Sequence, residues 1–351
     1  MRPYEFWHPR IFEAPYYAYL LLRCLRHGLS PLSIPKANWA LDHGELGLGS
    51  KYTTQMAFDQ SYFLPTVLLQ AEQPVEARRC TVRQFVAEHG LPLILKPDIG
   101  AVGKGVLKLD TAAALEAAIA DLAVDQLLQA YTPKREEYGV FFVRRQGRNA
   151  ITGINRKHFP EVTGNGRDSI ATLARQHYRY TSHWGLFLKY LDTNRVPADG
   201  ERVRLSFIGS HTMGCKFTED THLVSPALEA AVFAVADSQP GFNFGRLDVK
   251  ADSEAAFQAG EFVVIEVNGI ASLPTNMFDP ANSLRDAYRT FLAHGRMLVE
   301  IADEHRNRAM EIKTVRELWQ QARRNHGNLN SLHQAAIHQT QAESGALPRD
   351  G

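Results

Sequence analysis

The stretch LILKPDIGAVGKG, residues 93–105, is the feature that most limits how this chain can fold. A Walker A loop needs four residues between its first glycine and its Gly-Lys-Ser/Thr end, but only two separate Gly100 from Gly103, and Gly105 replaces the hydroxyl residue. A Rossmann fingerprint needs a helix directly after its glycines, whereas the VLKLD that follows alternates as a strand does. The stretch therefore predicts a strand ending near Lys96, a glycine-rich loop and a second strand. Such a hairpin could close over a nucleotide.

The overall charge excludes one large class of partner. The 351 residues carry a formal net charge of +1, whereas a nucleic-acid-binding protein normally gathers a basic excess on one face. We therefore expect no nucleic acid as partner. Cys24, Cys80 and Cys215 are odd in number and far apart, without a CxxC pair, which indicates neither a disulfide framework nor a zinc site. A cytoplasmic protein is the expectation that fits this cysteine usage best.

Residues 11–25 are rich in aromatic residues and leucine. The most apolar part, APYYAYLLLRCL, is too short to span a membrane and is interrupted by Arg23. Two interpretations stay open, a helix of the core or a helix that lies on a membrane surface or a partner. Under the second interpretation, residues 11–25 would contact a membrane surface or a partner, and a homodimer is compatible with the sequence.

The rest of the chain alternates between helical and strand patterns. Thr81 and Gln84 form a capping-box pattern that predicts a helix ending at Gly90. Two further helices are predicted directly after Thr111 and Ser169, and a third is predicted in PALEAAVFAVADS. A fourth helical region runs from Asn282 to Arg323, with an interruption at HRNR. The predicted strands are DQLLQAY, EYGVFFVRR, VRLSFIGS, GRLDVKAD and EFVVIEVN. This order predicts an α+β chain with a mixed sheet.

Two of these strands carry the side chains that indicate chemistry. Arg246 and Asp248 are two residues apart, as are Glu266 and Asn268, so each pair shares one face of its strand. If the strands are neighbours, an arginine, two carboxylates and an amide converge. Such oxygen ligands suit Mg²⁺, with two ions expected and Mn²⁺ as a substitute. The open alternative is that Asp248 pairs with Arg246 or Lys250 and that Glu266 only ends a strand.

The motifs LPLILKPDIGAVGKGV, EYGVFFV, FGRLDV and VVIEVN occur in the order of the nucleotide-binding core of ATP-grasp enzymes. Residues 50–295 resemble this family, in particular its D-alanine:D-alanine ligase and cyanophycin synthetase branches, and the whole chain is closest to an uncharacterised ligase-like group. The resemblance implies an ATP-grasp fold, in which two α/β subdomains sandwich the nucleotide. The implied parts are a shortened N-terminal region (1–80), a lid subdomain (81–140), a subdomain with the magnesium site (141–300) and a tail that is helical and then disordered (301–351).

The resemblance also implies roles for individual residues. Lys96 and Arg246 would be catalytic, and Lys96 would bind the nucleotide phosphates beneath a loop that contains Gly100, Gly103 and Gly105. The remaining implied ligands are Gln129, Ala130 and Tyr131 at the adenine hinge, Glu137 at the ribose, Lys51 at the phosphates, and Asp248, Glu266 and Asn268 at Mg²⁺. Glu136 is an alternative to Glu137, and Lys51 could instead be an exposed lysine at a helix start.

The reaction implied is the ATP-dependent joining of a carboxylate and an amine, small molecules or peptides, through an acyl phosphate. An ATP-grasp kinase and a non-catalytic nucleotide-binding module remain alternatives. The text NGIASLPTNMFDP, which begins at Asn268, departs from the Thr-Ser-Pro-Gly of the D-alanine ligases, and Ala101 and Val102 replace their loop serines, so D-alanine is not the expected substrate. Asn165 replaces the usual Asp of a cyanophycin synthetase turn. No covalent role is required of Cys215, His211 or His222, and His222 and Lys216 could line the acceptor site.

Overall fold

The computed structural model describes residues 4–47, 49–100, 103–181, 191–325 and 327. Its contacts divide the chain into two compact units. Unit 1 contains residues 1–68, 129–156 and 217–324, and unit 2 contains residues 69–128, 157–216 and 325–351. The domain boundaries expected after residues 80 and 140 fall inside helix α4 (Val75–His89) and strand β5 (Glu136–Arg145).

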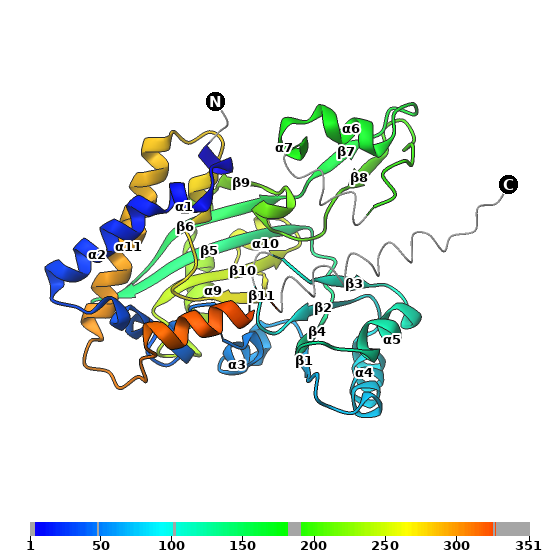
Figure 1. Ribbon diagram of the computed structural model, residues 1–351. Coiled ribbons are helices and arrows are strands. Elements are labelled where there is room, and N and C mark those ends of the chain that lie inside the picture. The colour runs from blue at the N-terminus through cyan, green and yellow to red at the C-terminus, as the bar shows by residue number, and fades with distance from the viewer. Residues whose placement is uncertain (1–3, 48, 101–102, 182–190, 326, 328–351) are drawn as a thin grey trace. The chain divides into compact units, whose positions relative to one another are not determined.

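Unit 1 is built on a five-stranded sheet with the order β11-β10-β5-β6-β9 (Figure 1). Strand β10 pairs antiparallel with β5 and with β11, and β5 pairs antiparallel with β6. The strands predicted in EYGVFFVRR, GRLDVKAD and EFVVIEVN are thereby confirmed. The other strands are β6 (Arg148–His158), β9 (Lys216–Glu219), β10 (Phe244–Ala251) and β11 (Val263–Asn268).

One face of this sheet is covered by helices α9 (Pro226–Asp237) and α10 (Glu254–Gln258). The odd-numbered residues of β10, among them Leu247 and Val249, are buried there with Val232 and Phe257. Because alternate residues of a strand point to opposite faces, the even-numbered residues of β10 belong to the other face. The predicted helix PALEAAVFAVADS is α9, capped by Ser225.

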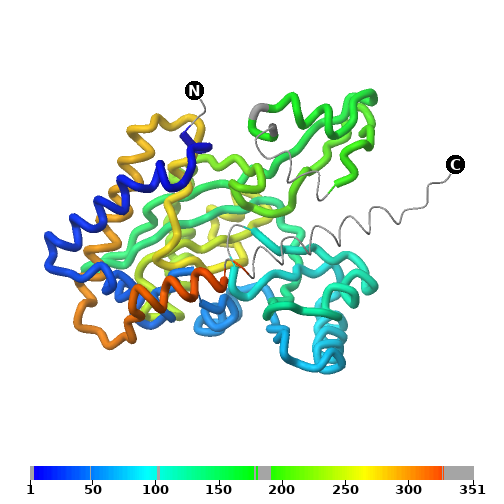
Figure 2. The backbone as a smooth tube through the Cα atoms, in the orientation of Figure 1, coloured from blue at the N-terminus to red at the C-terminus, as the bar shows by residue number. Residues whose placement is uncertain are grey.

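The second face is covered at one end by segments from both ends of the chain. Phe244 of β10 is buried there with Phe12, Tyr16 and Phe291, and the rings of Tyr16 and Phe291 stack with centroids 3.9 Å apart. Figure 2 shows the N-terminal segment, in dark blue, beside helix α11, in amber to orange. The elements concerned are η1 (Tyr4–Phe6), α1 (Pro9–Phe12), α2 (Ala14–His27), η2 (Pro31–Asn38), η7 (Thr275–Phe278) and α11 (Leu284–Glu304).

The segment after η2 is tied to the sheet by Asn38, which has no exposed surface. Its amide donates to the carbonyls of Gly44 and Phe244, and its oxygen accepts from the N–H groups of Asn243 and Phe244. A buried amide satisfied on both sides fixes the backbone around it. The short elements that follow are η3 (Asp42–Gly44), α3 (Lys51–Met56), capped by Ser50, and η4 (Gln60–Tyr62).

Unit 2 contains most of a four-stranded sheet of order β1-β4-β2-β3. The strands are β1 (Thr66–Leu69), β2 (Leu93–Pro97), β3 (Leu107–Leu109) and β4 (Gln126–Ala130), with helices α4 and α5 (Ala112–Ala120). Strands β2 and β3 pair antiparallel, which confirms the predicted hairpin. Thr111 caps α5, as expected. DQLLQAY forms β4.

A smaller layer of unit 2 contains β7 (Glu161–Thr163) and β8 (Arg202–Arg204), paired antiparallel, with α6 (Ile170–Gln176) and α7 (Tyr178–Thr181). Ser169 caps α6, which confirms the predicted helix start. Of the predicted strand VRLSFIGS only the first residues belong to β8. The 3-10 turns η5 (His211–Met213) and η6 (Thr221–Leu223) flank β9.

The capping box predicted at Thr81 and Gln84 is wrong. Helix α4 begins six residues earlier, at Val75, and both residues lie inside it. The hydroxyl of Thr81 donates to the carbonyl of Ala77 instead of capping the helix. The preceding VEARRC contains good helix formers and continues the helix upstream. The predicted end at Gly90 is confirmed, since this residue has a φ of 72° directly after the helix.

Helix α11 ends at Glu304, directly before the HRNR stretch, and residues 315–325 form a further helix. The tail predicted to be disordered from about residue 341 lies outside the described residues. Among the described residues, no helix is long and apolar enough to cross a membrane.

Candidate metal and nucleotide site

The predicted convergence of four polar side chains occurs on the second face of the sheet. Strands β10 and β11 pair so that Arg246 lies opposite Asn268 and Asp248 opposite Glu266. Directly opposite residues of neighbouring strands share a face. A register shift just after Asp248 lets Val264 turn to the other face, where it is buried. The bulge therefore keeps the carboxylates on one face and the valine in the core.

Asp248 is only 3% exposed and is held by Arg246. The guanidinium donates from Nε to Oδ1 at 2.7 Å and from Nη2 to Oδ2 at 3.1 Å. The amide of Asn268 lies 3.5 Å from Oδ2. The alternative that Asp248 pairs with Arg246 is therefore confirmed. This pairing does not exclude a metal, because a carboxylate has about four lone-pair positions.

Lys51 belongs to this cluster and is not an exposed helix-start lysine. Its ammonium lies 2.5 Å from Oε1 of Glu266, and its side chain is 19% exposed. Burial alone would lower the pKa of Lys51, but Glu266, Glu45 and Asp248 outweigh burial and raise it above its ordinary value. Lys51 is therefore cationic at neutral pH, which suits contact with phosphate.

A third carboxylate, Glu45, lies close to Lys51 and was not anticipated. It is 6% exposed and accepts a hydrogen bond from the Thr54 hydroxyl at 2.6 Å. Burial raises the pKa of Glu45, although the Thr54 hydrogen bond and the charge of Lys51 oppose the shift. Its backbone has a φ of 57°, a left-handed conformation that is unusual for glutamate. Strain of this kind is often kept where a side chain must be held in place.

Strand β5 contributes the residues that lie next to Asp248 on the same sheet face. Gly139 lies opposite Asp248 in the β10–β5 ladder, and a Cβ there would be 2.3 Å from the Asn155 oxygen and 3.2 Å from Oδ1 of Asp248. Only glycine lets these groups approach so closely. Glu137 lies two residues earlier on the same face, is 4% exposed, and has its carboxylate 3.7 Å from the ammonium of Lys250.

Glu136 points to the opposite face of β5 and is engaged elsewhere. Its carboxylate accepts hydrogen bonds from the guanidinium of Arg156 at 3.0 and 2.8 Å. Because alternate residues of a strand point to opposite faces, only Glu137 shares the face of Asp248. This geometry favours Glu137 over Glu136 as the predicted ribose ligand.

The loop after β11 is fixed by buried polar groups. The Asn155 oxygen accepts from the Thr275 hydroxyl at 3.0 Å, and the amide of Asn276 lies 3.5 Å from Glu219. Asn155 has no exposed surface, and its Nδ2 has no hydrogen-bond partner among the residues that the structure describes. A donor left in this position normally binds an ordered water.

His294 of α11 supports the same loop from the other side. Its Nε2 lies 2.8 Å from the carbonyl of Ser272. Burial, assisted by the charge of Arg246, lowers the pKa of His294 to about 4, although this hydrogen bond opposes the shift. His294 is therefore neutral at pH 7, so Nε2–H donates to Ser272.

The donor set fits a hard cation. Asp248 and Glu266 offer carboxylate oxygens, and a half-turn of the Asn268 carboxamide, whose oxygen and nitrogen are assigned rather than seen, would add an amide oxygen. Mg²⁺ commonly binds one or two carboxylates together with nucleotide phosphates. Among the described residues no group of three or more His, Cys, Asp or Glu side chains forms a closed metal cluster. The set therefore suits an ion completed by phosphate rather than a closed protein cage.

The predicted phosphate loop lies in unit 2. Lys96 is half-buried within β2, and Gly103 and Gly105 have φ values of 75° and 73°. A Cβ at Gly103 would also come within 2.3 Å of the Ile208 side chain. Glycine is thus required at Gly103 by both conformation and space. Residues 101 and 102 lie outside the described residues. The roles of Lys96, Gly100, Gly103 and Gly105 stay predictions.

The predicted adenine hinge consists of the last two residues of β4 and the residue after it. The Gln129 side chain donates to the Thr66 hydroxyl at 3.0 Å and to the carbonyl of Ile265 at 3.5 Å, so it braces β4 against β1 and β11. The N–H of Ala130 donates to the carbonyl of Pro65 at 2.9 Å. Tyr131 is 36% exposed. Recognition of adenine by backbone groups of these residues stays a prediction.

Covalent catalysis by cysteine has no support in the geometry. Cys215 has no exposed surface, and its Sγ donates to the carbonyl of Ile208 at 3.3 Å. A buried thiol of this kind normally fills space. His211 and His222 lie in η5 and η6, in different units. The suggestion that His222 and Lys216 line an acceptor site stays a prediction.

Some members of the site were accessible to sequence reasoning and others were not. Lys250 continues the alternation of Arg246 and Asp248, and a glycine inside EYGVFFV signals close backbone approach. Both could have been placed on the site face from the sequence. Glu45, Asn155 and His294 give no local signal, because their positions depend on which distant segments pack together.

Comparisons with known proteins give the following results. No protein-family model and no curated protein matches the sequence. Solved structures that are similar include D-alanine-D-alanine ligase from Helicobacter pylori (17% identity, TM-score 0.37), VanG D-Ala:D-Ser ligase from Enterococcus faecalis (12%, 0.42) and bifunctional glutathione synthetase from Pasteurella multocida (13%, 0.37). The matches cover 70%, 74% and 69% of this chain, which spans 60%, 62% and 36% of those proteins.

Proposed function

We propose that this protein is an ATP-dependent ligase that joins a carboxylate to an amine through an acyl phosphate and requires Mg²⁺. The observation that carries the proposal is the cluster on β10 and β11. Two cations, Arg246 and Lys51, and two carboxylates, Asp248 and Glu266, meet on one sheet face beside Asn268. A site that binds a nucleotide polyphosphate needs cations to neutralise the phosphate charge and carboxylates to hold the accompanying Mg²⁺.

In the proposed site, Asp248, Glu266 and Asn268 would hold one or two Mg²⁺ ions, with Mn²⁺ as a substitute. The metal would neutralise phosphate charge. Arg246 is fixed in orientation by its two hydrogen bonds to Asp248, so its guanidinium can meet phosphoryl oxygens without reorganising. Lys51 and Lys96 would bind phosphate, and Glu137 the ribose hydroxyls.

The chemistry balances in two steps. A substrate carboxylate oxygen attacks the γ-phosphorus of ATP, and the bond to the β–γ bridging oxygen breaks to release ADP. An amine nitrogen then adds to the carbonyl carbon of the acyl phosphate, the amine loses a proton, and phosphate departs with the electron pair of the carbon–oxygen bond. Because phosphoryl transfer depends mainly on positioning and charge neutralisation, no nucleophilic side chain is needed.

The test uses hydroxylamine as a general amine acceptor. The full chain is incubated with ATP, Mg²⁺, hydroxylamine and a panel of carboxylic acids, including amino acids and short peptides. The proposal predicts a hydroxamate and ADP in equal amounts for at least one acid. A stable phosphorylated product without hydroxamate would assign a kinase instead. Nucleotide binding without turnover across the panel would assign a non-catalytic module.

A further inference from the structure

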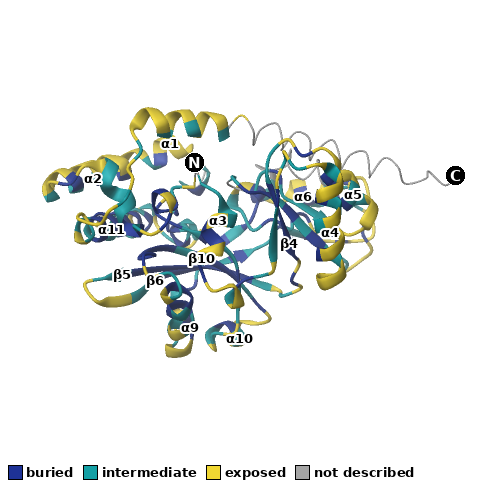
Figure 3. Cartoon of the chain, turned by 90° about the horizontal axis from the view of Figure 1, so that it is seen from below, coloured by how far each residue is buried: buried dark blue, intermediate teal, exposed yellow. Residues whose placement is uncertain are grey.

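The outward face of α2 is apolar along its whole length. Its exposed residues are Ala14, Pro15, Tyr17, Ala18, Leu21, Leu22, Leu25 and Arg26, of which only the last is charged. Leu22 and Leu25 are 64% and 75% exposed, and Ile11 in α1 is 67% exposed. Figure 3 shows the outer side of α2 in yellow. Single exposed leucines are common, but a continuous apolar face normally marks a binding surface.

Helix α2 is held in this orientation from below by the core. Phe12, Tyr16, Leu20 and Cys24 recur every four residues and are buried against α11 and the sheet. A helix with one buried apolar stripe and a second, exposed one is hydrophobic nearly all round. If α2 rotated about its axis, the buried stripe would become exposed and the exposed stripe buried, so an apolar stripe would face outward in either orientation. The outward face is therefore a stable feature of the fold.

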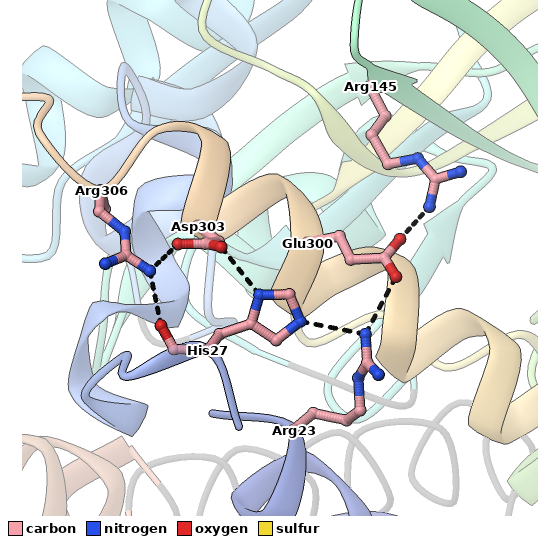
Figure 4. Close-up of polar contacts among 6 residues, drawn as sticks. All are labelled: Arg23, His27, Arg145, Glu300, Asp303 and Arg306. Atoms are coloured by element: carbon pink, nitrogen blue, oxygen red, sulfur yellow. Dashed lines mark hydrogen bonds and ion pairs between the residues drawn. The ribbon is translucent and has the colours of Figure 1, made fainter. Parts of the chain in front are cut away.

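A polar clamp along one edge fixes the rotation further (Figure 4). Arg23 donates to Glu300 at 3.0 Å and to His27 Nε2 at 3.1 Å, and His27 Nδ1 lies 2.8 Å from Asp303. Because the arginine can only donate, Nε2 of His27 accepts and Nδ1–H donates to Asp303. Arg145 pairs with Glu300 and Arg306 with Asp303. The clamp joins α2 to α11 and leaves the leucines outward.

The helices around the apolar face carry a modest excess of basic residues. Helices α1, α2 and α11 carry six arginines, Arg10, Arg23, Arg26, Arg285, Arg289 and Arg296, and four acids, Asp286, Glu300, Asp303 and Glu304, of which Asp286 pairs with Arg289 and Glu300 with Arg23. Arg10 and Arg26 lie at the two ends of the apolar segment. Arg285, Arg289 and Arg296 are spaced to form one stripe along α11, which packs beside α2. The three helices thus have a net charge of +2, whereas the whole chain has a formal net charge of +1.

We propose that α1 and α2 dock this protein onto a membrane surface that contains anionic lipid. Leucines and a tyrosine would enter the boundary between headgroups and acyl chains, and the surrounding arginines would meet lipid phosphates. The 14-residue helix lies in the plane of the surface and does not cross it. The net positive charge of these helices favours anionic headgroups over a second copy of the chain, in which like charges would face each other.

The test is sedimentation of the full chain with vesicles of phosphatidylcholine alone and of phosphatidylcholine mixed with phosphatidylserine. We expect binding to the mixed vesicles, weakened by salt, and little binding to phosphatidylcholine. The double variant Leu22→Gln/Leu25→Gln should bind at least roughly tenfold more weakly, because each leucine buries several methylene groups. Arg26→Gln and Arg296→Gln should each cost roughly fivefold.

The matched control is Val315→Gln/Trp319→Gln, which alters two exposed apolar residues, 66% and 57% exposed, outside α2. It should bind vesicles like the unaltered protein. Equal loss in both double variants, or no binding to either vesicle, would overturn the proposal. A dimer in analytical ultracentrifugation that Leu22→Gln/Leu25→Gln dissociates, without vesicle binding, would assign the face to a second copy instead. Far-ultraviolet circular dichroism verifies that every variant is folded.

Discussion

The β10–β11 pair and the β2–β3 hairpin are both antiparallel, yet they prepare for charge in opposite ways. On β10 and β11, cations and carboxylates are already matched, with Arg246 on Asp248 and Lys51 on Glu266. The hairpin instead offers Lys96, half-buried within β2, and glycines with positive φ. Matched charges on regular strands form a preorganised site. A glycine loop can change shape around a ligand, at the expense of conformational entropy.

The largest effect on turnover should come from removing a carboxylate of the matched charge pairs on β10 and β11. Asp248→Asn should lower Mg²⁺-dependent turnover roughly 10³-fold, because it removes a charge that both fixes Arg246 and would bind the metal. Glu266→Gln should act in the same direction. The measurement is the steady-state rate of ADP release at saturating ATP.

The control for this experiment is Asp252→Asn, which removes an equal charge just beyond the end of β10. Asp252 is 70% exposed and pairs only peripherally, with Lys134, so its loss should change turnover less than about twofold. Full activity of Asp248→Asn or Glu266→Gln would show that the metal assignment is wrong.

A second experiment compares two lysines of the β2–β3 hairpin, Lys96 in the strand and Lys104 in the loop. Lys96→Met should raise the KM for ATP roughly 100-fold, since a lysine held within a strand would contact phosphate directly. Lys104→Met removes the same charge from the Gly103-Lys104 pair that superficially suggests a Walker loop, and it should change KM less than about threefold. Equal increases in KM for the two variants would contradict the prediction that Lys96, and not Lys104, contacts phosphate.

A third experiment tests the protonation state of His294, which is hydrogen-bonded to the loop after β11. The folded pKa of His294, about 4, lies below the value of about 6.5 expected in the unfolded chain. Above pH 6.5 both states are neutral at this group. As pH falls from 6.5 toward 4 the unfolded state binds the proton first, and stability is lost, by about 2 kcal/mol at pH 5.

His294→Gln keeps a donor for Ser272 but removes this titration. The variant should therefore lose about 2 kcal/mol less than the unaltered protein when urea unfolding is compared between pH 7 and pH 5. An identical pH dependence in the two proteins would mean that His294 is not held neutral in the fold.

The comparison also explains what could be predicted from the sequence. Arg246, Asp248, Glu266 and Asn268 were placed correctly because period-two alternation assigns a strand residue to a face without any tertiary information. The start of α4 was misplaced because Thr81 looks like a cap while the upstream residues are equally helical. The partner of Lys51 depends on a segment more than two hundred residues away, and no local pattern encodes such a pairing.

The central claim is that the face of β10 and β11 binds a metal–nucleotide complex. The most direct measurement is a crystal structure of the full chain grown with ADP and Mn²⁺, with anomalous scattering used to locate the metal. The account predicts an anomalous peak within about 2.0–2.4 Å of oxygens of Asp248 and Glu266, bridged to nucleotide phosphate. Bound nucleotide with its metal elsewhere, while Lys51 still pairs with Glu266 and Arg246 with Asp248, would contradict it.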